Sequence, residues 1–337
     1  MDNSTAGFVA KGLISNETFA YLMVLFRLVL NPAVGILGLC ANVINVVVFY
    51  KMGLTDGVTQ NFFILSISDG CLASATIIAS VSYILYTQVY VGVGGPEYTA
   101  QVVYCASILI GAFPHSVSMA TTVVIAVIRC LCVAIPLHVK FLMTARRQLA
   151  VILAFSSCSA GLLIYAFSPS RAVLVNNPLT NTPFILIVDL KWFEYTVYSN
   201  ATSYIGFIIV IICVIVLTVS LNRSSSFRGK SASRVSTSVS TGEQTKDGRK
   251  EARVIKTVVF VSIVFIVCYL PAMTVTMIGT LVKEFSTVGI YRNANLLNLM
   301  IMDLFTAINA SVNIFIYYFF NTRFRTTFNT VFGKLPK

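Results

Sequence analysis

Three ionisable residues lie inside or at the end of long apolar runs, and they decide what chemistry the chain can do. Asp69 lies in NFFILSISDG, Asp303 lies in LMIMDLFTA, and Arg129 ends the run TTVVIAVIR. An ionisable side chain at membrane depth is costly and marks a functional hypothesis, although an arginine near a helix end can also extend to the headgroups. Asp69 must therefore be protonated, paired or ion-bound.

These residues do not indicate catalysis. The sequence has two histidines, His115 and His138, and no His, Glu or Asp cluster has metal-ligand or acid–base spacing. We therefore expect neither an enzyme nor a metal centre. A lone histidine such as His115 is more often a buried hydrogen-bonded group than a ligand contact, and both interpretations stay open.

The composition identifies the class of protein. Of the 337 residues, 57% are hydrophobic and only 11% are charged, whereas about a quarter of the residues of a soluble domain are charged. The net charge of +12 could indicate nucleic acid binding, but the lysines and arginines lie in short segments between apolar runs. We expect an integral membrane protein in contact with a lipid bilayer, with no nucleic acid partner.

Seven apolar runs are long enough to cross a hydrocarbon core of about 30 Å, which takes about 20 residues. In lipid, a helix satisfies its own backbone hydrogen bonds, so we expect helices even where Val and Ile are frequent. The fold predicted is an all-α membrane protein, a seven-transmembrane helix bundle over residues 23–320. Its spans are placed near 23–50, 61–87, 100–133, 148–168, 201–221, 254–282 and 295–320.

The basic residues predict the orientation in a plasma membrane. Most of the 24 lysines and arginines follow the first, third and fifth runs or lie in the tail, so the N-terminus is expected outside. Residues 1–22 are then extracellular, and the span 1 run serves as its own insertion signal. Three glycosylation sequons, at Asn3, Asn16 and Asn200, fall on the predicted outer side.

Polar and proline residues recur in the other spans. Asn42 in GLCANVINVVVF needs a partner on another helix. Pro271 in FIVCYLP removes a backbone donor and predicts a hinge in span 6. Span 7 carries Asn309, Asn313 and Tyr317, a density of polar groups that no lipid-facing helix would tolerate.

The connecting segments differ in character. Residues 169–200 hold three prolines and the only tryptophan, Trp192, and are expected to cap the outer cleft. Residues 222–253 are basic and rich in Ser and Thr, which predicts disorder and phosphorylation. In the tail, 321–337, phenylalanines recur every four residues from Phe320 to Phe332, which predicts a short amphipathic eighth helix on the inner membrane surface. The eight cysteines do not indicate a disulfide framework, because the loop 169–200 has none to pair with Cys105.

Together these features resemble the rhodopsin-like (class A) G-protein-coupled receptors. The resemblance rests on seven spans, an outer N-terminus, Asn42, LSISD in span 2, the Arg129–Cys130 pair, FxxCYxP in span 6 and NxxxY from Asn313 to Tyr317. It implies a ligand-gated conformational switch that acts on a heterotrimeric G protein. Departures are Ile128 in place of an acid, Tyr269 in place of Trp and Ile314 in place of Pro.

The resemblance also implies roles for particular residues. It implies a polar network around a sodium ion or water cluster, formed by Asp69, Ser118, Asn309 and Asn313. It places G-protein coupling at Arg129, Glu251, Pro271 and Tyr317, and ligand contacts at Gly111, His115, Tyr269 and Asp303. Asp303 could equally be a hydrogen-bond partner of another helix. Kinases and arrestin are expected at the Ser/Thr-rich residues 224–245.

The restraint on Arg129 is expected to be weak. Members of the resembled family pair this arginine with the preceding acid, and Ile128 cannot do so. Glu251 lies about 30 Å before Pro271 along a helix, level with the inner end of span 3. The hypothesis is that Glu251 carries the restraint alone and that basal signalling is appreciable; the alternative is a solvated loop charge.

A narrower resemblance concerns the ligand. KMGLTDGVTQNF, VIRCLCVAIPL and MTARRQL look like segments of gastropod mollusc chemosensory receptors. This favours a chemosensory receptor over a neuropeptide receptor, the alternative within the same fold. Gly111 stands where monoamine receptors carry an Asp, so an amine ligand is not expected. A membrane transporter is the alternative from another class, and the odd number of spans argues against it.

Overall fold

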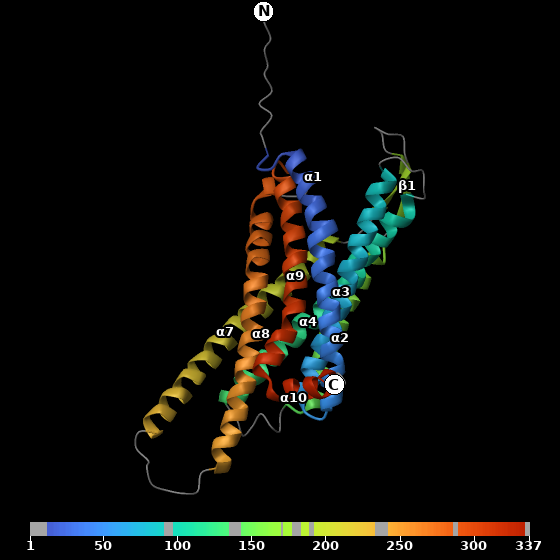
Figure 1. The fold of residues 1–337 in the computed structure, drawn as a ribbon. Helices are drawn as coiled ribbons and strands as arrows, with labels where there is room; N and C mark the ends of the chain where they lie inside the picture. Colours follow the sequence, from blue (N-terminus) through green and yellow to red (C-terminus); the bar gives the residue numbers. More distant parts are fainter. Residues whose placement is uncertain are drawn as a thin grey trace, which may run out of the picture.

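A computed structural model describes residues 12–90, 97–134, 143–169, 171–176, 183–188, 192–232, 242–285 and 289–333. Figure 1 shows a bundle of long helices with a hairpin beside it. The helices are α1 (Asn16–Val24), η1 (Leu25–Leu30), α2 (Asn31–Met52), α3 (Gly57–Tyr90), α4 (Glu97–Ala134), α6 (Ala145–Phe167), α7 (Trp192–Ala232), α8 (Gly242–Leu281), η2 (Lys283–Phe285), α9 (Arg292–Phe320) and α10 (Thr322–Phe332), and the strands are β1 (Arg171–Asn176) and β2 (Pro183–Val188).

Seven helical segments of the described chain are long and apolar enough to cross a membrane, which confirms the predicted spans. The first runs from Asn16 to Met52 and so begins earlier than expected. It begins there because the Ser15 hydroxyl accepts a hydrogen bond from the Thr18 amide and caps α1. We refer to the end of the bundle that carries α1 and the hairpin as the N-terminal face, and to the end that carries α10 as the C-terminal face (Figure 1).

The helices close into a ring through successive contacts. Helix α2 packs against α3 and α9, α3 packs against α4, α4 packs against α6 and α7, and α8 packs between α7 and α9. Two clusters of buried side chains fill the ring. One surrounds Phe49, Phe62 and Tyr317, and the other surrounds Phe207 and Phe265. Close packing of these side chains limits the movement of the helices that carry them.

The first span contains a π-helical turn, η1, that includes Arg27. Such turns are rare and arise where the regular hydrogen-bond ladder is interrupted. Pro32 follows directly in the first turn of α2 and has no amide hydrogen to donate to the preceding turn. The extra residue in the π turn changes the direction in which Arg27 projects relative to a regular helix.

A β-hairpin occupies part of the loop that was expected only to cap the cleft. Its strands pair antiparallel, with Arg171 opposite Val188 and Asn176 opposite Pro183. The hairpin lies beside the start of α4, which β2 contacts (Figure 1). The aromatic segment that contains Trp192 is not a loop, because it forms the first turns of α7.

The segment 222–253 is more helical than predicted. Helix α7 continues to Ala232 and α8 begins at Gly242, while residues 233–241 lie outside the described chain. Extension of an existing helix fixes only one residue for each added hydrogen bond, so the spans can propagate into a polar sequence that would not nucleate a helix alone.

The tail helix α10 is present, but its phenylalanines do not share one environment. The Asn321 side chain caps the helix by accepting a hydrogen bond from the Phe324 amide at 3.1 Å. Phe324 is fully buried, 5.0 Å between ring centroids from Phe49, and belongs to the bundle core. Phe328 is half-buried and Phe332 is exposed. Only the end of the predicted stripe is therefore free to meet lipid.

Candidate functional site

The Asp69 carboxylate is the centre of a buried polar cluster between α3, α4 and α9. Its Oδ1 accepts a hydrogen bond from the Ser118 hydroxyl at 2.6 Å, and its Oδ2 accepts one from Asn313 Nδ2 at 2.9 Å. Asp69 has no exposed surface. The structure thus brings together Asp69, Ser118 and Asn313, three of the four residues that the resemblance implies for a polar network. Asn309 is buried one turn before Asn313 on α9.

The amide of Asn42 ties α2 to the same region of α9. Its Nδ2 donates to the carbonyl oxygens of Gly38 at 2.9 Å and Ala310 at 2.8 Å. The backbones approach closely here because Gly38 has no side chain: a Cβ atom at that position would collide with the Ser311 hydroxyl. The predicted need of Asn42 for a partner on another helix is confirmed.

Two buried polar atoms near this cluster lack a partner within the described chain. They are Asn313 Oδ1 and the Tyr317 hydroxyl. Tyr317 lies among aromatic rings, 4.9 Å between centroids from Phe62 and 5.0 Å from Phe49. Buried polar groups in proteins are usually satisfied by protein groups or by ordered water.

A second contact links the centre of α4 to α8. The Tyr269 hydroxyl and His115 Nε2 share a hydrogen bond at 3.1 Å. The Tyr269 ring stacks on the Phe265 ring, with 4.4 Å between their centroids, and the centroid of Phe265 lies 6.3 Å from that of Phe207 of α7. His115 is thus the hydrogen-bonded group that its position in an apolar helix suggests, and its partner lies two residues before Pro271.

A small cavity opens beside His115 between α4, α6 and α7. Its volume is about 110 Å³. The described residues that line it carry mostly hydroxyl groups and no carboxylate, lysine or arginine: Ala112, His115, Ser116, Met119, Phe155, Ser159, Tyr198, Ser199, Thr202 and Ser203. The contribution of α7 was not predicted, although Tyr198, Ser199, Thr202 and Ser203 have the spacing of one helix face.

The other two predicted ligand contacts lie elsewhere. Gly111 is buried against Ala75 and Leu72 of α3 and does not line the cavity described here. Asp303 of α9 forms an ion pair with Arg27 of the π turn, with 3.1 Å between Oδ2 and Nη1. The structure therefore places Asp303 as an interhelical partner, one of the two alternatives open from the sequence.

Of the predicted coupling residues, Arg129 and Tyr317 lie toward the C-terminal face, near the ends of α4 and α9, whereas Pro271 lies in the half of α8 that leads to the opposite face. Arg129 is half-buried near the end of α4, and Pro271 lies within α8. Glu251 belongs to α8, but its side chain lies outside the described part of the structure, so the proposed pairing with Arg129 stays a prediction. Ile128 is buried with 6% of its surface exposed, so an acid at that position would be desolvated.

A larger cavity of about 710 Å³ lies at the C-terminal face between the ends of α2, α8 and α9 and the start of α10. Lys51, Thr257, Asn321 and Arg323 contribute to its wall. Arg323 lies 3.5 Å from the Asp56 carboxylate. This hollow contains both basic and polar groups.

The glycosylation sequons differ in setting. Asn16 is exposed at the start of α1, where its Oδ1 accepts a hydrogen bond from Asn293 at 2.8 Å. Asn200 is half-buried within α7, and Asn3 lies outside the described residues. Among the residues that the structure describes, no group of three or more His, Cys, Asp or Glu could hold a metal ion, and the cysteines are free thiols. The Cys105 side chain and the whole of His138 fall outside that description.

Comparisons with known proteins agree with this geometry. The family described as 7 transmembrane receptor (rhodopsin family) matches residues 41–326. Among solved structures, the crystal structure of squid rhodopsin has a TM-score of 0.63 at 17% sequence identity, over 95% of this chain and 87% of that chain. A search of the curated proteins finds no match. The family match covers well over half of the chain, from span 1 into α10.

Proposed function

We propose a function from the premise that this chain belongs to the rhodopsin family of seven-transmembrane receptors. In this proposal, a small uncharged ligand binds in the cavity beside His115 and switches the receptor from one conformation to another. The family consists of G-protein-coupled receptors and not of enzymes, so the partners are an extracellular ligand and a heterotrimeric G protein. The transporter alternative has no support from this family match.

The observation that carries the proposal is the contact of His115 with both the cavity and Tyr269. His115 lines the cavity on α4, and its Nε2 lies 3.1 Å from the Tyr269 hydroxyl on α8. A ligand that binds the imidazole or displaces this hydrogen bond changes the stability of one α8 position relative to another. Only such differential binding can shift the equilibrium between two receptor states.

Helix α8 is suited to respond because Pro271 interrupts its hydrogen-bond ladder next to Tyr269. In the proposed switch, the half of α8 that precedes Pro271, which contributes Val254 and Thr257 to the cavity at the C-terminal face, moves and enlarges that cavity. A G-protein segment would bind there, with Arg129 contributing charge and Tyr317 lying near the same face. The segment 224–245 would be a target of kinases and arrestin.

The Asp69 cluster fits a bound sodium ion by its chemistry. Small hard cations prefer oxygen ligands, and the cluster offers the Asp69 carboxylate, the Ser118 hydroxyl and Asn313 Oδ1, which has no partner among the described groups. When bound, sodium would neutralise the carboxylate and hold α3, α4 and α9 together. Without sodium, the two observed hydrogen bonds do this alone.

The cavity supports a chemosensory role over a neuropeptide one. A volume of about 110 Å³ holds a small molecule and not a peptide. The lining hydroxyls suit neutral hydrogen-bonding groups, since an unpaired buried charge is strongly unfavourable. The proposed orientation is a multi-pass plasma-membrane protein with the N-terminal face outside, where the exposed Asn16 is available for glycosylation.

A nucleotide-exchange assay tests the proposal. Membranes that contain the receptor are mixed with purified heterotrimeric G protein and screened with uncharged small organic molecules and, separately, with a tryptic peptide mixture. We expect activation by members of the first set only. Ser159→Phe should abolish it, because Ser159 lines the cavity, whereas Ser157→Phe at an exposed position of α6 should not. Activation that survives Ser159→Phe at equal surface expression would refute the assignment of the cavity.

A further inference from the structure

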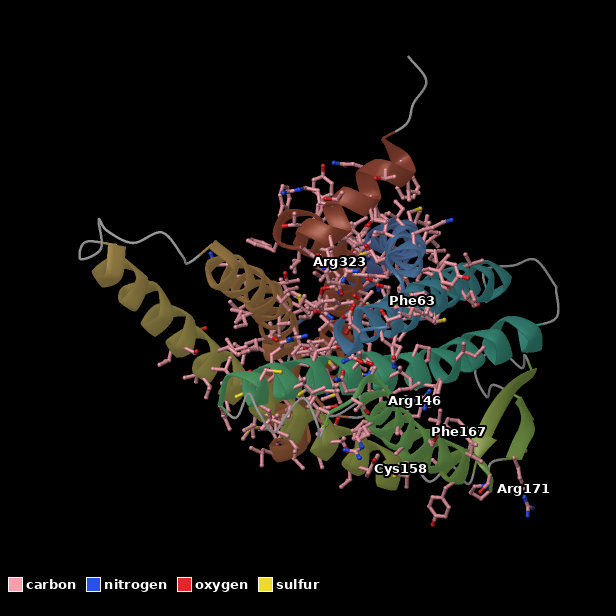
Figure 2. All side chains as sticks on the ribbon, turned by 90° about the horizontal axis from the view of Figure 1, so that it is seen from below. Phe63, Arg146, Cys158, Phe167, Arg171 and Arg323 are labelled. Carbon is pink, nitrogen blue, oxygen red and sulfur yellow. The ribbon has the colours of Figure 1, made fainter. Side chains whose placement is uncertain are left out.

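A second cavity lies next to the first, displaced toward the C-terminal face, at the seam between α4, α6 and α7. Its volume is about 370 Å³, within the range of about 300–1,000 Å³ typical of ligand sites. Its lining is mostly apolar: Met119, Ala120, Val123, Val124, Val151, Phe155, Tyr198, Thr202, Ile205, Gly206 and Ile209. In Figure 2 the labelled Cys158 marks the region where α6 lies beside α7.

This apolar cavity opens toward the lipid. Val151 of α6 and Ile205 of α7 form its lips, and their exposed fractions are 49% and 60%. Both residues belong to membrane-length apolar segments. The absence of a side chain at Gly206 leaves part of this space free, because a Cβ atom there would lie 2.7 Å from the Met119 methyl group. Molecules dissolved in the membrane thus reach the cavity without crossing water.

The two cavities share a wall. Met119, Phe155, Tyr198 and Thr202 line both the polar cavity and the apolar one. The shared wall carries two hydroxyl groups with hydrogen-bonding capacity left. Thr202 donates its proton to the Tyr198 carbonyl at 2.7 Å, so its oxygen can still accept. The Tyr198 hydroxyl donates to the Cys158 sulfur at 3.7 Å. Because a thiol sulfur is a weak acceptor, a ligand oxygen can replace it as the acceptor of this proton.

We propose that this seam binds an uncharged amphiphile, a membrane-dissolved molecule with a hydroxyl or carbonyl head and a hydrocarbon tail. A hydroxyl head accepts from Tyr198 and donates to Thr202, and the tail lies along Val151 and Ile209. Thr202 and Ile209 are about 10 Å apart along a helix, which suits a chain of medium length. The inference deepens the proposed function. Binding at the seam does not depend on that function, but an effect of binding on His115, through Met119, does.

The head group must provide the selectivity. A hydrocarbon tail gains little on leaving lipid for a protein cavity, because both surroundings are apolar. A carboxylate or ammonium head would be disfavoured, since the described lining of the two cavities offers it no countercharge. A neutral alcohol should therefore bind more tightly than an acid or an amine of the same chain length.

Photocrosslinking in phosphatidylcholine nanodiscs tests binding without any G protein. The probes are decanol, decanoic acid and decyltrimethylammonium, each with the same diazirine on its chain, and labelled peptides are mapped by mass spectrometry. We expect the decanol probe to label α6 and α7 near Val151 and Ile205 saturably. Unlabelled decanol should compete, and the charged probes should label these peptides about tenfold less.

Two pairs of variants provide matched controls. Val151→Trp fills the cavity from an exposed lip and should reduce saturable labelling about tenfold, whereas Leu153→Trp, also exposed on α6 but outside the lining, should leave it unchanged. Gly206→Val should act like Val151→Trp, and Gly161→Val, where a Cβ atom meets open space, should not. Because Val151 and Leu153 are exposed, neither substitution in the first pair displaces a buried side chain.

The outcomes separate this proposal from the proposed function. Labelling that is non-saturable, equal for all three probes, or insensitive to Val151→Trp would overturn the amphiphile site, whatever the receptor does to a G protein. Saturable labelling without nucleotide exchange would uphold the site and leave the receptor proposal to be judged by its own assay.

Discussion

Replacement of Phe324 by alanine should release α10 from the bundle. The Phe324 side chain has no exposed surface and lies among Phe49, Tyr317 and Phe328, with ring centroids 5.0, 5.6 and 6.4 Å away. Truncation of a buried phenylalanine costs about 3–5 kcal/mol. A released side chain can still enter lipid, so we take the lower limit, about 3 kcal/mol.

Amide hydrogen exchange of α10 measures this loss. A change of about 3 kcal/mol raises the population of the undocked helix more than about a hundredfold, and exchange of the α10 amides should accelerate by the same factor. Exchange in the centre of α3 should not change. Phe332→Ala is the matched control, because Phe332 is 43% exposed and its loss should change α10 exchange by less than about tenfold. Equal acceleration in the two variants would refute the assignment of Phe324 to the bundle core.

Three further predictions concern buried or paired charges. Asp69→Ala should lower the midpoint of thermal unfolding more than Asp69→Asn does, because alanine loses both observed hydrogen bonds. The native receptor should have a higher midpoint in sodium chloride than in choline chloride, whereas the midpoint of Asp69→Asn should be the same in both salts. Arg27→Asp and Asp303→Arg should each lower the midpoint, and the double variant, in which the two charges are exchanged, should restore it. A double variant whose midpoint stays low would contradict the ion pair. Glu251→Gln should raise basal nucleotide exchange if that carboxylate restrains Arg129, and unchanged exchange at matched surface expression would exclude the restraint.

The sequence was sufficient for the spans and for part of the polar cluster. Hydropathy determines membrane segments because lipid leaves the backbone almost no choice but a helix. Asp69 and Asn313 could be paired because carboxylate and amide groups in apolar helices require partners, and the family resemblance indicated which. The distances of 2.6 and 2.9 Å at Asp69 agree with that reasoning.

Other features depend on packing that no local pattern contains. Arg27 and Asp303 lie at opposite ends of the chain, and the π turn that presents Arg27 cannot be recognised from its residues. Burial of the Phe324 side chain in the bundle depends on the angle between α9 and α10, since the same four-residue spacing would also suit a helix lying wholly on lipid.

The β-hairpin was missed although its signals were present. Two runs of β-branched and aliphatic residues, 171–176 and 183–188, flank a segment that contains Asn177 and Pro178, which favour a turn. The hydroxyl face of α7 was missed for a different reason. Ser and Thr are common on transmembrane helices, and only the position of α6 and α4 opposite Tyr198 and Thr202 makes that face part of a cavity.

The contact between His115 and Tyr269 is the most direct point at which to test whether the cavity controls the receptor. Basal nucleotide exchange on purified heterotrimeric G protein should be measured for His115→Ala, Tyr269→Phe and the double variant at equal surface expression. Each single variant removes the 3.1 Å hydrogen bond, so each should shift basal exchange in the same direction, and the double variant should equal either single one. Additive effects, or no effect in either single variant, would contradict the claim that α4 and α8 are coupled through this contact.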